Sequence, residues 1–457
     1  MAERREMVLN AFTMNCVGHI NHGLWTHPRD RSCDYTRLDH WTALARTLER
    51  GLFDAVFIAD VLGVYDVYGG GIEVTAREAV QLPVNEPTLL VPAMAAATRH
   101  LGFGVTVNIA NEHPYTFARR AATLDHLTDG RFGWNVVTGY LDSAARAVGE
   151  DGLAGHDSRY DRADDYLDLL YKLWEAGWDD GAIRRDKDAR VYADPAKIHL
   201  VRHEGPFYRS DGYGLAEPSR QRTPVLFQAG TSGRGQLFAA RHAECVFISA
   251  PDKPAARRAA RALRDAAAAA GREPSDLKVI MGATVVAGAS AAEARDKLAD
   301  YVRHASPEAG LAHFGAGSGI DLAPYGLDEP ISKAPTNAIQ STTGAAQARG
   351  LTKRQLLAEL AIGGRYPLVV GDGPAVAAEL ASWMEDGEVD GFNLTRTVEP
   401  ECWDDFVALV VPALQERGIH KSGYREGSLR HKLFGHGDRL PARHAGSAAA
   451  RSAGVAR

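Results

Sequence analysis

Short apolar runs of strand character alternate along the chain with longer stretches in which apolar residues recur at helical spacing. Leu38, Trp41 and Ala45, for example, share one face of such a stretch. Short buried strands separated by helices are typical of a parallel sheet. Eight runs have strand character: Met7–Phe12, Asp54–Asp60, Gly102–Ile109, Phe132–Val137, Pro224–Ala229, Cys245–Ala250, Lys278–Val286 and Gly391–Arg396.

Eight alternations favour a closed (β/α)8 TIM barrel over an open, doubly wound sheet. Three intervals, at about 61–87, 141–220 and 305–390, are too long for plain connections. We therefore place them as insertions over the carboxyl-terminal face of the barrel. Residues 1–436 then form a single domain. The tail 437–457 is rich in small and basic residues with little to bury, so we expect it to be disordered.

Composition narrows the possible classes of function. The chain has 457 residues, of which 45% are apolar, so it can bury a large core. A formal net charge of -6 provides no basic field, and we expect no nucleic-acid partner. The four cysteines lack the spacing of a disulfide framework or a zinc site. No apolar run approaches the roughly 18 residues of a membrane span, so we expect a cytoplasmic protein without a membrane partner.

Polar and aromatic residues gather where the first four strands end. Chemistry in a (β/α) barrel takes place at the carboxyl ends of its strands. Any one of these residues could merely cap a helix or a turn, but their accumulation at successive strand ends predicts an active site. They are Phe12, Cys16, His19, His22, Trp25 and His27 around the first end, Asp60 at the second, Thr106 and Asn108 at the third, and Asn135, Thr138 and Tyr140 at the fourth.

The fifth strand is followed by "FQAGTSGRG", Phe227–Gly235, and then by a helical pattern. Small and hydroxyl residues at this place expose backbone N–H groups at the positive end of a helix dipole, which suits a phosphate. An ordinary tight turn with a serine cap is the alternative. His156, Arg159 and Tyr160 precede another helix and could complete a phosphate site. Their alternative is the solvated, salt-bridged start of that helix.

Two further patterns indicate neither a dinucleotide site nor a metal site. "GAGSGI" at Gly315 resembles a dinucleotide-binding loop, but it follows no convincing strand, so we expect a flexible loop. His19, His22 and His27 lack the His-x-His spacing that a metal-dependent barrel hydrolase would favour. The sequence therefore indicates no metal site.

Eight motifs, in order, resemble one protein family. They are "LNAF", "LERGLFDAVFIAD", "LDHLTDGRFGWNVVTG", "RYDRADDYLDLLYKLWE", "ADPAKIHLVRHEGPFY", "PVLFQAGTSGRG", "VVPALQERG" and "YREGSLRHKLFG". Over roughly residues 7 to 435 the chain is similar to the flavin-dependent monooxygenases that act on nitrilotriacetate, EDTA and dibenzothiophene sulfone, within the bacterial luciferase-like superfamily. "LNAFTMNCVGH" and "FIADVLGVYDVYGG" are most similar to the large subunit of dimethylsulfide monooxygenases.

The resemblance implies a two-component enzyme built on a TIM barrel and assembled as a homo-oligomer. Reduced FMN would come from a separate NADH-dependent flavin reductase and react with dioxygen to give a flavin hydroperoxide. The hydroperoxide would oxygenate a small organic substrate, for example an organosulfur compound whose C–S bond is cleaved. Cleavage of a C–N or other C–heteroatom bond, a flavin- or deazaflavin-dependent dehydrogenase without oxygen chemistry, and a flavin-binding protein that has lost catalysis remain alternatives.

The implied chemistry and the resemblance suggest roles for single residues. A histidine with a pKa near neutrality could exchange protons with an intermediate, and the candidates are His19, His22 and His313, although each could instead have a structural or surface role. Gly139 stands where the sulfone-cleaving relatives have serine, and we expect it to open space. The expected FMN-binding residues are Asp60, Thr106, Asn135 and Val137 around the flavin and the cleft, and His156, Tyr160, Gly230 and Ser232 at the phosphate. A dry site also needs an apolar wall, and the expected substrate pocket consists of Phe12, Trp25, Phe57, Thr138 and Tyr140. The first three could equally belong to the barrel core.

Overall fold

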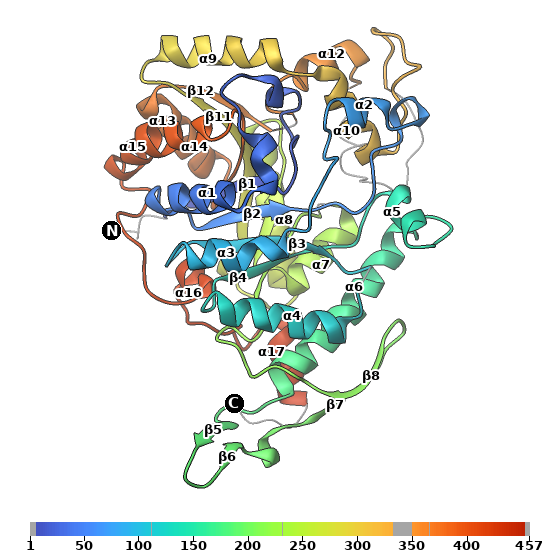
Figure 1. The fold of residues 1–457 in the computed structure, drawn as a ribbon, viewed down its shortest axis with the longest axis vertical. Coiled ribbons are helices and arrows are strands. Elements are labelled where there is room, and N and C mark those ends of the chain that lie inside the picture. The colour runs from blue at the N-terminus through green and yellow to red at the C-terminus, as the bar shows by residue number, and fades with distance from the viewer. Residues whose placement is uncertain (1–5, 111, 231, 332–349, 365, 453–457) are drawn as a thin grey trace.

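Eight parallel strands close into a barrel in the computed structural model, which describes residues 6–452 except 111, 231, 332–349 and 365 (Figure 1). Each of the eight predicted runs overlaps one of these strands, so the predicted TIM barrel is confirmed. The barrel strands are β1 (Val8–Met14), β2 (Ala55–Ala59), β3 (Gly102–Asn108), β4 (Phe132–Val137), β9 (Val225–Gln228), β10 (Cys245–Ile248), β11 (Lys278–Ala287) and β13 (Gly391–Thr395).

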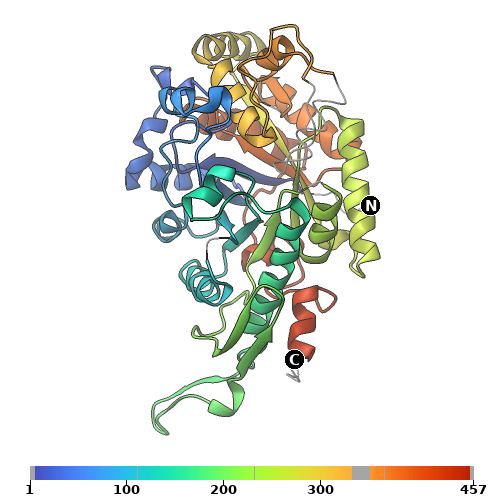
Figure 2. The same cartoon turned by 90° about the vertical axis from the view of Figure 1, so that its right-hand side faces the viewer.

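Helices surround the barrel on the outside (Figures 1 and 2). The barrel closes where β10 pairs with β11, and β13 lies between β1 and β11. A further strand, β12 (Leu368–Gly371), pairs with the last residues of β11 and was not predicted. The helices are α1 (Leu38–Arg50), α2 (Glu73–Arg77), α3 (Val91–Ala96), α4 (Pro114–Leu127), α5 (Asp142–Ala147), α6 (His156–Tyr171), α7 (Gly233–His242), α8 (Lys253–Ala269), α9 (Ala291–His304), α10 (Pro307–Ser318), α12 (Lys353–Glu359), α13 (Gly373–Asp386), α14 (Glu401–Asp405), α15 (Val411–Glu416), α16 (Leu429–Phe434) and α17 (Ala445–Ser452).

Aromatic rings lie inside the barrel, where two strands carry glycine next to them. A Cβ at Gly104 would be 2.7 Å from Cδ2 of Phe57, and one at Gly133 would be 2.5 Å from Cε2 of Phe227. Phe57 is 2% exposed and packs in a core cluster, so it belongs to the barrel core. Below the rings, Leu429 of α16 closes the base of the barrel.

Two of the inserted segments meet at the mouth of the barrel. Arg77 of α2 forms an ion pair with Glu308 of α10 at 2.6 Å, and the Gly69 N–H donates to Asp321 Oδ1 at 2.9 Å. The expected flexible loop at Gly315 is wrong, because this residue lies inside α10. That helix tolerates small residues because they allow close packing against its neighbours.

The insertion at 141–220 divides between two places. Its first helix, α5, lies at the mouth, where the Ser143 hydroxyl donates to the Val64 carbonyl at 2.7 Å. Its two hairpins, β5 (Ile183–Asp186) with β6 (Val191–Ala193) and β7 (Leu200–Glu204) with β8 (Arg209–Tyr213), form the projecting end of the molecule (Figure 1). The Asp165 carboxylate on α6 accepts the backbone N–H groups of Phe207 and Tyr208, both at 2.8 Å. This hairpin therefore lines the outside of α6 and does not cover the mouth.

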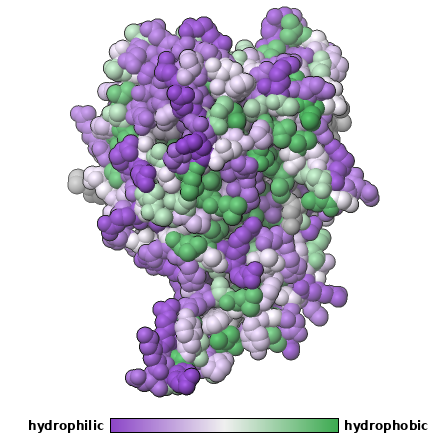
Figure 3. Space-filling view, in the orientation of Figure 1, coloured by the Kyte–Doolittle hydropathy of each residue, from purple (hydrophilic) through white to green (hydrophobic). Residues whose placement is uncertain are grey.

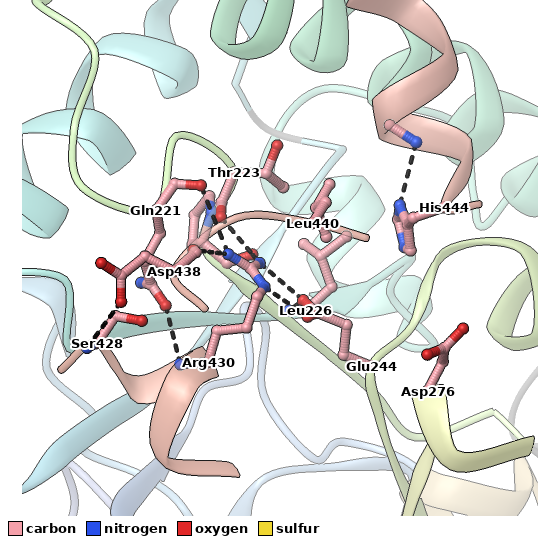
Figure 4. A network of polar contacts seen from close by, with 12 residues as sticks. Gln221, Thr223, Leu226, Glu244, Asp276, Ser428, Arg430, Asp438, Leu440 and His444 are labelled. Atoms are coloured by element: carbon pink, nitrogen blue, oxygen red, sulfur yellow. Dashed lines mark hydrogen bonds and ion pairs between the residues drawn. The ribbon is translucent and has the colours of Figure 1, made fainter. Parts of the chain in front are cut away.

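The carboxyl-terminal segment is folded against the base of the barrel. Arg443 forms an ion pair with Asp276 at 2.5 Å, and Nε2 of His444 lies 2.9 Å from the His242 carbonyl oxygen. Leu440 is only 2% exposed (Figure 4). The disorder expected for 437–457 is therefore wrong as far as Ser452, because polar anchors compensate for the lack of apolar residues. Residues 453–457 lie outside the described part, as do 332–349 of the third insertion.

A buried ion pair fixes the same base. Arg430 Nε donates to Glu244 Oε1 at 2.6 Å, and Arg430 Nη2 donates to Glu244 Oε2 at 2.9 Å (Figure 4). The same guanidinium donates to the backbone carbonyls of Thr223, Pro224 and Asp438. A buried charge is tolerated when it is paired and hydrogen-bonded in this way.

The face shown in Figure 3 carries both hydrophilic and hydrophobic residues. In the view of Figure 3, hydrophobic side chains gather in patches across the middle of the face and are sparse over its upper left part. Among the helices described here, none combines the length and apolar character needed to cross a membrane.

Candidate active site at the mouth of the barrel

The loop after β1 is held over the mouth by Asn21, which sequence reasoning missed. Its Nδ2 donates to Thr395 Oγ1 at 3.2 Å and to the Arg396 carbonyl at 2.7 Å, while its Oδ1 accepts the Gly363 N–H at 2.7 Å. Arg396 in turn donates to the carbonyls of Cys16 and Val17. One buried amide and one buried guanidinium thus fix the loop that carries His19 and His22.

The structure brings two of the three candidate histidines together. His22 Nε2 lies 3.0 Å from Nδ1 of His313, which projects from α10. Burial and the positive charge of Arg396 lower the pKa of His22 to about 3. His22 is therefore neutral near pH 7, and the near-neutral pKa expected of a catalytic histidine is wrong for this residue. His19 lies elsewhere in the mouth, where its ring meets Phe12 edge-on at 4.6 Å.

Two tyrosines continue this polar cluster from the first insertion to the fourth strand. The Tyr65 ring stacks on His313 with centroids 5.2 Å apart. The Tyr65 hydroxyl donates to Gln81 Oε1 at 2.6 Å and lies 2.7 Å from the Tyr140 hydroxyl. Since the proton of Tyr65 is directed to Gln81, Tyr140 is the donor in the second contact. Tyr65 and Gln81 were missed because their segment reads as a connection, although its excess length was a signal.

Expected flavin-binding residues meet at the ends of β2, β3 and β4. Asn135 Nδ2 donates to Thr106 Oγ1 at 2.9 Å, whereas Asn135 Oδ1 has no partner among the described residues although the side chain is 96% buried. Val137, two residues on, remains half-buried. Burial, with a smaller contribution from the charge of Glu86, raises the pKa of Asp60 to about 7.

The two sequence segments expected at a phosphate also come together. Ser232 caps α7 by accepting the Gly235 N–H at 3.1 Å, and His156 Nε2 lies 3.2 Å from the Ser232 hydroxyl. The His156 and Tyr160 rings are 5.2 Å apart. A Cβ at Gly230 would overlap the ends of the Gln228 and Tyr160 side chains, so glycine lets both lie close to the backbone. Thr231, within the same loop, lies outside the described residues.

The alternative interpretation of this region, a salt-bridged helix start, is also partly correct. Arg234 donates to carboxylates of Asp161 and Asp164 on α6, and its guanidinium lies 5.7 Å from the centre of the Tyr160 ring. The charge of Arg234 is therefore paired with carboxylates on α6. The donors that face a phosphate are therefore His156, the Ser232 hydroxyl and the N–H groups of the first turn of α7.

Comparison with known proteins identifies the family. The family described as "Luciferase-like monooxygenase" matches residues 17–390. The chain belongs to this family. It is 46% identical over 439 residues to dimethyl-sulfide monooxygenase of Hyphomicrobium sulfonivorans, covering 95% of this chain and 92% of that protein. It is also 45% identical over 441 residues to long-chain alkane monooxygenase of Geobacillus thermodenitrificans, covering 96% and 97%.

A solved structure of another protein has the same overall shape. The crystal structure of a riboflavin lyase with modified FMN and its substrate riboflavin superposes with a TM-score of 0.93 at 37% identity, covering 99% of this chain and 100% of that chain. The present protein is therefore a luciferase-like monooxygenase with the TIM barrel predicted from its sequence.

In this luciferase-like monooxygenase, Gly139 has a conformational role that the sequence did not indicate. Its φ is +78°, a region that residues with a Cβ rarely adopt. A Cβ there would also lie 3.0 Å from Asn108 Nδ2. The glycine therefore serves the backbone turn between Thr138 and Tyr140, and the idea that it merely opens space is corrected.

The expected substrate-pocket residues do not form a single group. Phe12 contacts Phe57 with ring centroids 5.6 Å apart, and Tyr140 belongs to the cluster with Tyr65. Trp25 lies in a short helical turn, Leu24–Thr26, that packs against α9. A pocket role for each of the five residues stays a prediction.

One group of side chains in this monooxygenase has the composition of a metal site. Potential ligand atoms of His27, Asp300 and His304 lie within 4.8 Å of one another. Asp300, however, already pairs with Arg29 at 3.5 Å and with Arg303 at 2.5 Å. Two guanidinium groups disfavour a cation at this carboxylate, so we interpret the group as a clamp between the β1 loop and α9.

Proposed function

We propose that this luciferase-like monooxygenase is the oxygenase of a two-component system. It binds reduced FMN made by a separate NADH-dependent flavin reductase and oxygenates a small organosulfur compound with cleavage of a C–S bond. The observation that carries the proposal is the cradle of His156, Tyr160 and Ser232 at the amino end of α7. Its Ser232 follows β9, the strand that pairs with β4, and Asn135 on β4 has a buried amide oxygen without a described partner.

The residues present fit FMN at both ends. The Ser232 hydroxyl, His156 and the first turn of α7 supply donors for a phosphate. Asn135 Oδ1 is a buried acceptor without a described partner, which suits an N–H of the flavin ring. When bound, reduced FMN supplies the electrons that activate dioxygen.

The protein itself excludes water from the site and holds polar groups in fixed positions. Apolar residues from β1, the first insertion, α5 and α10 pack together at the mouth, which excludes water from the reacting centre. His22 remains neutral and fixes the ring of His313, while Tyr140 presents its phenol from the end of β4. The similarity to a dimethyl-sulfide monooxygenase supports a sulfide as the substrate.

Stopped-flow mixing with dioxygen tests the proposal. With reduced FMN bound, we expect the absorbance of oxidised FMN to return far more slowly than for the free flavin. Ser232→Ala should weaken binding of reduced FMN at least ~tenfold, because charged hydrogen bonds are each worth roughly 1.5–3 kcal/mol. Ser290→Ala is the matched control, since Ser290 caps α9 in the same way, away from the cradle.

Two results would contradict the proposal. If Ser232→Ala bound reduced FMN as tightly as wild type, the proposed phosphate-binding role of the cradle would be wrong. Turnover of substrate without dioxygen, with oxidised FMN retained on the protein, would favour a dehydrogenase.

A further inference from the structure

One aromatic ring inside the barrel comes from a loop and not from a strand. Tyr366 lies between α12 and β12, and a Cβ at Gly282 of β11 would overlap its ring. Gly282 faces the barrel interior, because Ile280, two residues earlier on the same strand, packs with Phe57. The Tyr366 ring therefore occupies the space that a side chain at position 282 would fill.

Tyr366 completes an aromatic wall from the mouth to the middle of the barrel. Its ring centroid is 6.5 Å from that of Phe12, which is 5.6 Å from Phe57, which in turn is 4.4 Å from Phe247. Phe12, Phe247 and Tyr366 remain partly exposed. Leu429 at the base belongs to the same apolar cluster as Phe12 and Phe247. We infer that the exposed parts of the three rings face the mouth, and we call the space that they line the inner pocket.

The loop that carries Tyr366 is anchored on both sides of the ring. The Gly363 N–H donates to Asn21 Oδ1 at 2.7 Å, and the Tyr366 N–H donates to the Gly363 carbonyl at 3.1 Å. On the other side, the Thr284 N–H donates to the Pro367 carbonyl at 2.9 Å. These contacts fix the depth to which the ring enters the barrel.

The chemistry of the inner pocket favours an uncharged, polarisable ligand. Its three rings carry no formal charge and lack a strong ion-pairing group, so a charged substrate would lose hydration without compensation. A thioether sulfur, in contrast, interacts favourably with the edges of aromatic rings at about 5 Å.

We propose that Tyr366, seated on Gly282, is the residue that sets substrate size. Its ring closes the inner pocket and restricts the monooxygenase to thioethers with short alkyl arms. This inference rests on the proposed function and adds to it a size limit and the residue that imposes it.

Substitutions at position 366 test the inference. We would measure kcat/KM for dimethyl, diethyl and dibutyl sulfide. We would also measure the binding of each sulfide to the flavin-free protein by calorimetry. Tyr366→Ala should raise kcat/KM for dibutyl relative to dimethyl sulfide at least ~tenfold, mainly through KM, because single methylene groups change discrimination by roughly tenfold or more. Tyr366→Phe keeps the ring and should keep the wild-type order. Tyr192→Ala, an exposed tyrosine on β6, is the control.

The outcomes separate the two proposals. Wild type could slow the return of oxidised FMN and convert sulfides, while Tyr366→Ala leaves the order of kcat/KM among the sulfides unchanged. In that case the size limit is wrong and the monooxygenase proposal stands. If wild type converts no sulfide, both the sulfide proposal and the size limit fail. Tyr366→Leu, which keeps an apolar side chain, decides the question should the alanine variant not fold.

Discussion

Asp60 makes the stability of the protein depend on pH. Burial raises its pKa from an ordinary 3.8 to about 7, and the charge of Glu86 contributes. The folded protein therefore keeps a proton that the unfolded chain releases between about pH 4 and pH 7, so the contribution of this site to stability is greatest at low pH and falls as the pH rises towards 7.

Removing the charge of Asp60 should abolish this dependence. At pH 8, Asp60→Asn should unfold at a higher temperature than wild type, by the equivalent of roughly 2–4 kcal/mol, since each pKa unit is worth about 1.4 kcal/mol. At pH 3, below both pKa values of Asp60, the two proteins should unfold at nearly the same temperature. If the two proteins unfolded at the same temperature at pH 8, burial of the ionised Asp60 carboxylate would not destabilise the protein. Asp39→Asn, on the exposed side of α1, is the control.

The contact between His22 and His313 joins two elements, the β1 loop and α10. Without the His22 ring, the His313 ring loses one of its fixed neighbours. We expect His22→Ala to divert more of the electrons of reduced FMN to hydrogen peroxide, measured as the ratio of peroxide to oxygenated product. His27→Ala is the matched control, because it removes another buried histidine of the same loop that contacts a different helix, α9. If His22→Ala left the ratio of peroxide to oxygenated product unchanged, His22 would have no role in the mechanism.

Elements with strong local patterns were predictable from the sequence, and those fixed by distant contacts were not. Every barrel strand was predicted, because each is a run of apolar residues between helices. Helix α10 was mistaken for a loop because its glycines lower helix propensity, although Ser306 before Pro307 is a typical helix start. The site residues Asn21 and Tyr366 carry no local signal, since their roles depend on contacts with residues far along the chain.

At the scale of the whole molecule, the carboxyl-terminal segment acts as part of the barrel base. Deleting 438–457 removes buried Leu440, the ion pair of Arg443 and the contact of His444 with the His242 carbonyl. We expect this deletion to destabilise the protein by ~3 kcal/mol or more, since a buried leucine alone contributes roughly 1.5–3 kcal/mol. Chemical denaturation measures the loss, and Arg443→Ala gives the share of the ion pair. A truncated chain as stable as the intact one would contradict this role.

The position of β13 between β1 and β11 has a consequence for biosynthesis. During translation, the first strand leaves the ribosome early, but the strand that pairs with its other edge is among the last to be made. Until then, the nascent chain carries an open sheet whose two free edges offer unpaired N–H and C=O groups to any other extended chain. Productive folding of this enzyme in a crowded cell therefore depends on shielding those edges until its final segment has emerged.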